Sequence, residues 1–208
     1  MTDPHSLLLF FAAGLALNFT PGPDMLYVAA RGASEGRAAG VASALGIASG
    51  TLVHIALVAG GLAALLAAVP VAYTIVRLAG GAYLVYLGAR ALLRPSGLAL
   101  RTLAPASRWA VYRQGVLTNV LNPKVALFFL AFLPQFVSPA RGNTALQVLA
   151  LGLLFDTTGT LVNLAVALGA SRVSARLRRS SRAARIMERA TGALFVGLGV
   201  RIAIAGRH

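Results

Sequence analysis

Two short stretches a hundred residues apart decide the fold that we expect of this chain: residues 18–24, Asn-Phe-Thr-Pro-Gly-Pro-Asp, and residues 118–124, Thr-Asn-Val-Leu-Asn-Pro-Lys. Each stretch places proline, polar side chains and a charged residue within a long apolar segment. Proline lacks an amide hydrogen and clashes with the carbonyl group four residues before it, so it interrupts a helix. We therefore expect a broken helix at each of the two stretches.

The composition around these stretches is that of an integral membrane protein. Of the 208 residues, 58% are hydrophobic and 12% are charged, and the mean hydropathy is +0.77, whereas soluble domains are about 45–50% apolar and about 25% charged. A soluble enzyme is therefore excluded. The net charge of +14 does not predict a nucleic-acid partner, because the basic residues lie between apolar runs without interleaved aromatic residues. The absence of cysteine excludes disulfides, thiolate nucleophiles and cysteine-based zinc sites.

A helix needs about 20 mostly apolar residues to cross a bilayer, and the chain contains six segments of that kind. We place them at about residues 6–29, 38–68, 71–92, 112–137, 144–168 and 187–205. Thirteen of the 19 Lys and Arg residues fall in the loops on one side of these segments, and three fall on the other. The positive-inside rule then predicts three cytoplasmic loops and two periplasmic termini. We assign no site to the arginine-rich loop at 172–189, which we expect to face solvent and anionic lipid.

The two halves of the chain resemble one another. Residues 50–57 (GTLVHIAL) match residues 159–166 (GTLVNLAV) at five of eight positions, and residues 79–90 match residues 190–201 at seven of twelve. The two matches occur in the same order at offsets of 109 and 111. Three helices is an odd number, so the second half must enter the membrane from the opposite side.

We therefore predict an all-α integral membrane protein with six transmembrane helices, arranged as a 3+3 inverted repeat in which helices 1 and 4 are broken. Residues 1–208 form a single transport domain, with repeat one at about 1–93, a cytoplasmic loop at about 94–111 and repeat two at about 112–208. Inverted repeats with interrupted helices are common in secondary transporters, whose substrate sites lie near the bilayer midplane.

The breaks also hold the candidate binding residues. Pro21 and Pro23 free the carbonyls of residues 17 and 19, and Pro123 frees that of Asn119. Thr20 before Pro21, and Asn122 before Pro123, are each expected to cap a restarting helix, and such helix N-termini favour a carboxylate. Asp24 and Lys124 add opposite charges, which together suit a zwitterion; alternatively, they neutralise one another while the prolines serve packing. The predicted substrate-binding residues are Asn18, Thr20, Pro21, Gly22, Pro23, Asp24, Asn119, Asn122, Pro123 and Lys124.

Three residues are candidates for proton coupling: Asp24, Asp156 and His54. Asp156 has hydroxyl-bearing neighbours; the alternative is that it is a helix-end residue near the interface. His54 matches Asn163 in the repeat, which favours a hydrogen bond between helices over a proton relay. An intramembrane hydrolase using Ser49 and His54 is disfavoured, because five residues on one helix separate them by about 140°.

Four blocks of the chain resemble the lysine-exporter (LysE/RhtB) family of bacterial amino-acid efflux carriers. They are residues 18–31 (NFTPGPDMLYVAAR), the segment beginning at Gly40 (GVASALGIASGTLVH), residues 79–90 (AGGAYLVYLGAR) and residues 115–136 (GVLTNVLNPKVALFFLAFLPQF). The resemblance implies a six-helix inner-membrane protein that exports amino acids or close derivatives by proton antiport.

That resemblance also limits the partners that we expect. No enzyme activity, cofactor or resident metal is implied, and the expected partners are an amino acid and membrane lipid, with a homo-oligomer left open. Relatives in the wider superfamily resemble metal-ion exporters, which supplies the alternative function. Only Asp24, Asp156 and His54, on three separate segments, would offer ligands to a metal ion.

Overall fold

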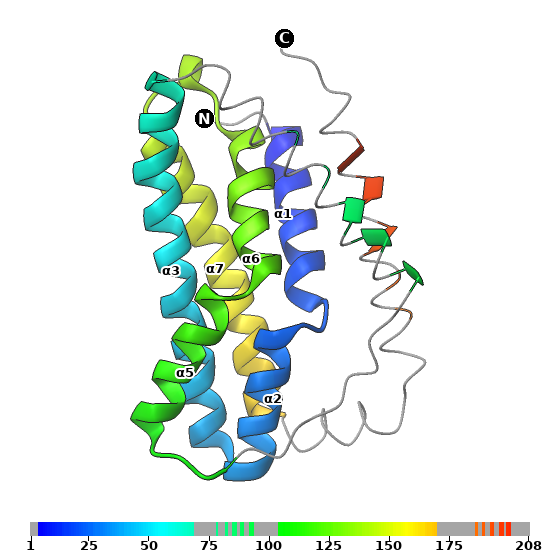
Figure 1. Cartoon of the computed structure of the whole chain (residues 1–208), viewed down its shortest axis with the longest axis vertical. Helices are drawn as coiled ribbons and strands as arrows, with labels where there is room; N and C mark the ends of the chain where they lie inside the picture. Colours follow the sequence, from blue (N-terminus) through cyan, green and yellow to red (C-terminus); the bar gives the residue numbers. More distant parts are fainter. Residues whose placement is uncertain are drawn as a thin grey trace.

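The computed structural model shows a bundle of helices (Figure 1) and describes residues 4–68 and 104–169, with isolated positions between 78 and 93 and between 186 and 200. Its elements are α1 (Pro4–Phe19), α2 (Pro23–Glu35), α3 (Arg37–Ala68), α5 (Arg108–Val120), α6 (Pro123–Leu127), the π-helix η1 (Phe128–Phe132), the 3-10 helices η2 (Leu133–Phe136) and η3 (Pro139–Arg141), and α7 (Thr144–Leu168). No strand occurs in the described residues. The all-α prediction is confirmed for this part of the chain.

The two long helices, α3 and α7, pack against one another and against the other helices of the bundle. Residues 37–61 of α3 and 144–168 of α7 are each 25 residues long, with mean hydropathies of 1.9 and 1.5, so each is long and apolar enough to cross a membrane. Their bounds agree with the segments predicted at 38–68 and 144–168. The bounds of such helices can be predicted from sequence because long apolar runs contain no charged residue or proline to interrupt them.

The other described helices form two bent pairs. The axes of residues 6–19 and 23–35 differ by 45°, and those of residues 108–120 and 123–136 differ by 46°. Figure 1 shows both breaks near the middle height of the bundle, with α1–α2 running down and α5–α6 running up. The first pair, α1–α2, extends to Glu35 and is therefore longer than the segment predicted at 6–29. The second pair, α5–α6, begins at Arg108, four residues before the segment predicted at 112–137.

The predicted cap at the first break is wrong. The Thr20 amide bonds back to the Ala16 and Leu17 carbonyls, each at 3.1 Å, and its hydroxyl donates to the Ala16 carbonyl at 2.6 Å, so Thr20 closes α1. The next helix begins two residues later than expected, with Gly22 as the N-cap in an extended conformation and Pro23 in the first turn. Both prolines lie beyond α1, because a residue without an amide hydrogen cannot extend its hydrogen-bond ladder.

The second break follows the prediction. Asn122 is the N-cap of α6, and its side-chain oxygen accepts a hydrogen bond from the Lys124 amide at 3.0 Å, with Pro123 in the first turn. The helix then widens into the π-helix η1 and tightens into η2, which begins at Leu133. Pro134 gives the physical reason, because its ring would clash with the carbonyl four residues before it in a regular α-helix.

The predicted helices at 71–92 and 187–205 lie largely outside the described residues. The isolated positions that the structure describes there are helical. A Cβ atom on Gly88 would lie 2.5 Å from the Gly192 carbonyl oxygen and 2.7 Å from Val196 Cγ2. The two segments that match in sequence therefore contact one another at Gly88.

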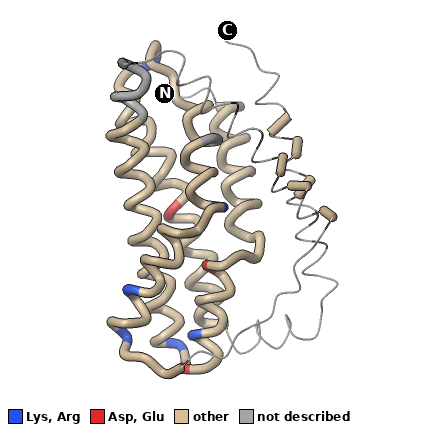
Figure 2. The backbone as a smooth tube through the Cα atoms, viewed as in Figure 1, with Lys and Arg blue, Asp and Glu red and all other residues tan. Residues whose placement is uncertain are grey.

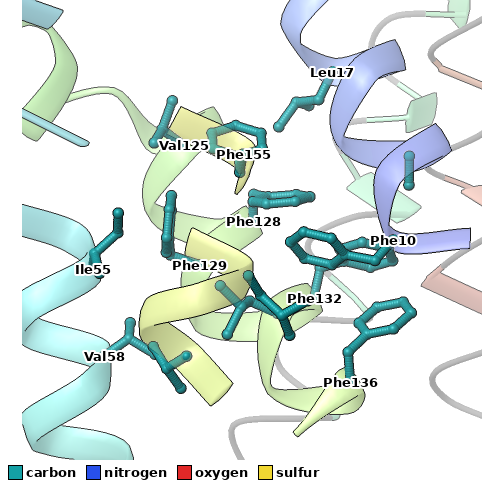
Figure 3. Close-up of a cluster of buried hydrophobic side chains, with 14 of the residues drawn as sticks. Phe10, Leu17, Ile55, Val58, Val125, Phe128, Phe129, Phe132, Phe136 and Phe155 are labelled. Carbon is teal, nitrogen blue, oxygen red and sulfur yellow. The ribbon is translucent and has the colours of Figure 1, made fainter. Parts of the chain in front are cut away.

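Aromatic rings pack against one another inside the bundle, as Figure 3 shows. The buried rings come from α1, η1, η2 and α7: Phe10, Phe128, Phe129, Phe132, Phe136 and Phe155. The Phe128 and Phe155 rings stack with their centroids 4.4 Å apart, and those of Phe10 and Phe136 meet edge-on at 5.2 Å. We call this group the aromatic cluster.

Charged residues gather at the opposite end, where α2 ends and α3 and α5 begin (Figure 2). Arg31 lies there at 3% exposure. Its guanidinium donates to the Glu35 carboxylate, to the Ala104 carbonyl at 2.9 Å and to the Gln114 side-chain oxygen at 2.6 Å. Tyr27 lies under the guanidinium, 5.6 Å from the ring centroid, and donates to the Val111 carbonyl at 2.8 Å. We call this group the Arg31 cluster.

Candidate functional site

A small polar cavity lies where the two bent pairs meet α3 and α7. Its volume is about 30 Å³, which is room for one or two water molecules. The cavity is lined by Leu17, Asn18, Thr20, Asp24, Met25, Ile47, Thr51, Asn119, Lys124, Val125, Phe155, Asp156, Gly159, Thr160 and Asn163. Two carboxylates and one ammonium group therefore face one space between apolar helices.

Asp24 is buried in the first turn of α2 and is held by an amide rather than by a cation. Its Oδ2 accepts a hydrogen bond from Asn119 Nδ2 at 2.8 Å, while its Oδ1 has no hydrogen-bond partner among the described residues. Asn122 lies beside Asp24, and its Nδ2 is likewise without a partner in that part of the chain. Asp24 Oδ1 and Asn122 Nδ2 are thus neighbouring buried polar atoms without a hydrogen bond in the described residues.

Lys124, which follows the second break, binds backbone carbonyl groups at the first break. Its Nζ donates to the Leu17 carbonyl at 3.2 Å and to the Thr20 carbonyl at 3.1 Å. Its side chain passes over Gly22, where a Cβ would lie 3.0 Å from Nζ. The carbonyl freed by Pro21 has therefore found a partner in the other half of the chain. Within the described residues, no direct ion pair joins Lys124 to Asp24.

Asn18 connects the first break to α7. Its Nδ2 donates to the Phe155 carbonyl at 3.2 Å and to the Thr158 hydroxyl at 3.0 Å. Its Oδ1 lies against Gly159, where a Cβ would come within 2.9 Å. The glycine therefore lets the polar side chain approach the helix backbone.

Asp156 lies at the middle of α7, twelve residues from either end of the helix. Twelve residues correspond to about 18 Å of helix, so the alternative interpretation as a helix-end residue is wrong. Thr51 and Thr160 line the same cavity as its carboxyl group. Asp156 thus contributes a carboxyl group to the cavity from α7.

His54 is a buried neighbour of the cavity rather than part of its lining. Its Nε2 lies 3.2 Å from the Asn119 carbonyl oxygen, the group freed by Pro123, and its ring stacks on Phe129 with a centroid distance of 5.8 Å. This is the hydrogen bond between helices that the sequence favoured. Ser49 has other partners, the Leu45 carbonyl and the Tyr112 hydroxyl.

The predicted site residues are only partly brought together. Asn18, Thr20, Asp24, Asn119, Lys124 and Asp156 line the cavity, whereas Pro21, Gly22, Pro23, Asn122, Pro123 and His54 do not. Thr51, Thr160 and Asn163 line it without having been predicted as site residues. The repeat carried a signal for them, because Thr51 corresponds to Thr160 and the candidate His54 corresponds to Asn163. Among the described residues, no three His, Asp or Glu side chains come together as metal ligands would.

Comparison with known proteins gives a consistent family. The sequence profile described as LysE type translocator matches residues 15–206. An uncharacterized membrane protein of Pseudomonas aeruginosa is 36% identical over 89% of this chain and 88% of its own length. A homoserine/homoserine lactone efflux protein of Salmonella typhimurium is 31% identical over 92% of both chains, and a leucine efflux protein of Salmonella choleraesuis is 27% identical over 93% of this chain and 92% of its own. No solved structure matches the chain.

Proposed function

Because the chain belongs to the LysE type translocator family, we propose that it is a secondary transporter that exports amino acids or close derivatives, driven by proton antiport. The observation that carries this proposal is the arrangement of charges in the cavity. Asp24 and Lys124 face the same space, yet each is held by neutral groups and not by the other. Two unlike charges held apart suit the two ends of a zwitterion.

The names of the relatives support the Asp24 pole in particular. Leucine and homoserine each carry an α-ammonium and an α-carboxylate group, whereas homoserine lactone keeps only the amine. We assign the substrate ammonium to the Asp24 carboxylate, which lines the cavity, and the carboxylate, where there is one, to Lys124. Asn18, Thr20, Asn119 and Asn122 provide polar groups around them, with Pro21, Gly22, Pro23 and Pro123 shaping the backbone.

The size of the cavity implies that the bundle moves during transport. A space of about 30 Å³ holds water and not an amino acid. The structure therefore corresponds, in this proposal, to a closed state between the inward-open and outward-open states of an alternating-access cycle. Asp24, Asp156 and His54 are the proposed carriers of the coupling proton.

We further propose that each bent pair is one broken span, within a six-span inverted repeat that occupies residues 1–208. Reciprocal contacts between the halves support the repeat. A Cβ on Gly50 of α3 would meet Asn119 of the second break, and a Cβ on Gly159 of α7, its counterpart in the repeat, would meet Asn18 of the first. The proposed location is the bacterial inner membrane, with both termini in the periplasm.

The experiment that tests the function is efflux from proteoliposomes preloaded with labelled amino acids or, separately, with divalent metal ions, with and without an imposed pH gradient. Gradient-stimulated release of one class of amino acid is the expected result. Release of metal ions alone would instead establish the metal-exporter alternative, and release of neither would contradict the transport proposal.

Asp24→Asn tests the charge assignment in the same vesicles. Asparagine keeps the shape of the side chain but cannot pair with an ammonium group, so we expect efflux to fall by about tenfold to a hundredfold, as for a lost charged hydrogen bond of 1.5–3 kcal/mol. Glu188→Gln removes the same charge elsewhere and serves as the control. Undiminished efflux by Asp24→Asn at equal protein content would show that Asp24 is not the ammonium pole.

A further inference from the structure

The cavity contains a route between its two carboxylates that runs through neutral side chains. Asn119 is 1% exposed, and its Nδ2 holds Asp24 Oδ2. Its other side-chain atom, Oδ1, lies 3.4 Å from the Thr51 hydroxyl oxygen. Thr51 and Asp156 line the same small cavity, with no hydrogen bond between them in the described residues. One hydroxyl therefore stands between the group that we assign to the substrate and a group that we assign to the proton.

The Thr51 hydroxyl has one proton and three competing acceptors. It lies 3.2 Å from the Ile47 carbonyl and 3.4 Å from Asn119 Oδ1, and the Asp156 carboxyl group in the lining of the same cavity is a third acceptor toward which it can turn. The hydroxyl can donate to only one of them at a time. An ionised carboxylate is the strongest acceptor of the three, because a charged partner makes a hydrogen bond about twice as strong. The protonation state of Asp156 therefore decides where the Thr51 proton points.

We propose that Thr51 is a positioning residue for coupling: it communicates the protonation of Asp156 to Asp24 through Asn119. When Asp156 is ionised, Thr51 donates to it and leaves Asn119 Oδ1. When Asp156 takes up a proton, its own hydroxyl can donate to Thr51 Oγ1, and Thr51 donates to Asn119 instead. A hydrogen bond to Oδ1 polarises the amide and strengthens its Nδ2 bond to Asp24.

The direction of this effect is the one that antiport requires. A carboxylate that is better satisfied by Asn119 attracts an ammonium group less, so protonation of Asp156 weakens substrate binding at Asp24. The other charged group that faces Asp156 across the cavity is Lys124 of α6, in addition to Asp24 of α2. From α3, His54 contacts the Asn119 carbonyl rather than the cavity, and the described part of α1 places no ionisable side chain in the lining.

The proposal rests on the proposed function, and the test separates the two. Thr51→Val replaces the hydroxyl with a methyl group of similar size, and Thr51→Ser keeps the hydroxyl. Each variant is reconstituted with labelled leucine or homoserine, whichever the wild-type protein carries. Exchange at equal pH measures binding and alternating access, and efflux under a pH gradient measures coupling.

We expect Thr51→Val to exchange substrate within about fivefold of wild type, the factor that one neutral hydrogen bond of ~1 kcal/mol represents, and to lose the stimulation of efflux by the gradient. Thr51→Ser should regain that stimulation. The pH dependence of exchange should also flatten in Thr51→Val. Thr157→Val, on the exposed face of α7, is the matched control and should behave as wild type.

Full gradient stimulation in Thr51→Val would overturn the proposal. So would a loss of exchange and coupling in equal proportion, because that would indicate only a structural role. If Thr51→Val does not reach the membrane, Thr51→Ala removes the same hydroxyl, and the same outcomes apply. A wild-type protein that exchanges amino acids without any response to pH would instead contradict proton antiport in the proposed function.

Discussion

Arg31 joins three parts of the chain through one side chain. Its guanidinium bonds to Glu35 on its own helix, to Gln114 on α5 and to the Ala104 carbonyl ahead of α5, and Glu35 in turn accepts from the Ala106 amide at 3.0 Å. A buried charge that loses its partners costs far more than the intact pair contributes. The Arg31 cluster therefore depends on this one residue.

Arg31→Met should destabilise the protein by about 1–3 kcal/mol, because the Ala104 carbonyl and Gln114 would lose their charged donor and the partly buried Glu35 its cation. The double variant Arg31→Met with Glu35→Gln should recover part of that loss, since the unpaired charge is removed. Chemical unfolding in mixed micelles measures both. Arg37→Met, at an exposed position near the same end of the bundle, is the control, expected to change stability by less than about 0.5 kcal/mol. Equal effects of Arg31→Met and Arg37→Met would contradict this account of the cluster.

For single residues, the sequence predicted which side chains carry charge at the site better than it predicted which atoms they contact. Asp24 and Lys124 could be identified because charges inside apolar segments are rare and costly. The cap at Asn122 was correct and the cap at Thr20 was wrong, because a threonine hydroxyl can bond forward to an amide or back to a carbonyl, and Thr20 bonds back to Ala16. Thr51 was not identified, because its approach to Asp156 depends on how α3 crosses α7.

Among the elements, α3 and α5 pack closely through glycine. A Cβ on Gly50 would lie 2.8 Å from the Val116 carbonyl oxygen, and one on Gly115 would lie 2.7 Å from the Ser43 carbonyl oxygen. Side chains larger than hydrogen cannot fit at these positions without moving a helix backbone. Small residues allow such approach in membrane helices, where dispersion forces and not the hydrophobic effect hold helices together.

Gly50→Ala should therefore separate α5 from α3 and reduce stability by about 1–3 kcal/mol, as overpacking does elsewhere. Transport should fall with it, because Asn119 lies on the displaced helix. Gly60→Ala provides a control in the same helix, since no described atom lies within 4 Å of the point that its Cβ would occupy. Alanine there should be neutral or stabilising by up to about 1 kcal/mol. If both variants unfold alike, the close approach of α5 does not limit stability.

The bounds of a helix could be predicted from sequence where the helix is a regular α-helix, and could not where it is distorted. The ends of α3 and α7 followed from uninterrupted apolar runs, and both breaks followed from proline. The π-helix η1 did not, because its sequence, Phe-Phe-Leu-Ala-Phe, is compatible with an ordinary α-helix. Only the position of Pro134 one turn later marked the distortion, and its effect depends on how the neighbouring rings pack.

For the molecule as a whole, the described charges are unevenly divided between the two ends (Figure 2). Arg31, Arg37, Arg108 and Arg113 lie toward the end where α3 and α5 begin, while the turn before α7 carries Arg141. The positive-inside rule predicts that the first end faces the cytoplasm. The six-span arrangement and the 3+3 repeat remain predictions, because the helices that complete them fall largely outside the described residues.

The orientation can be tested by labelling, since the chain has no cysteine of its own. Ala140→Cys, exposed ahead of α7, should react with a membrane-impermeant maleimide added to the periplasmic side. Ser34→Cys, exposed at the end of α2, should react only in inside-out vesicles. The reverse pattern would show that the termini face the cytoplasm.

The bond from Lys124 to the Leu17 carbonyl also has a consequence for biosynthesis. The two residues are 107 positions apart, and a ribosome adding about 5–20 residues per second needs roughly 5–20 s to make that length of chain. During this interval the first break has left the ribosome without the Lys124 ammonium group, and the Leu17 carbonyl keeps only its bond from the Thr20 amide among the described residues. Hydrocarbon offers it no further partner. We therefore expect the first half of the protein to stay near water or the insertion machinery until the second half arrives.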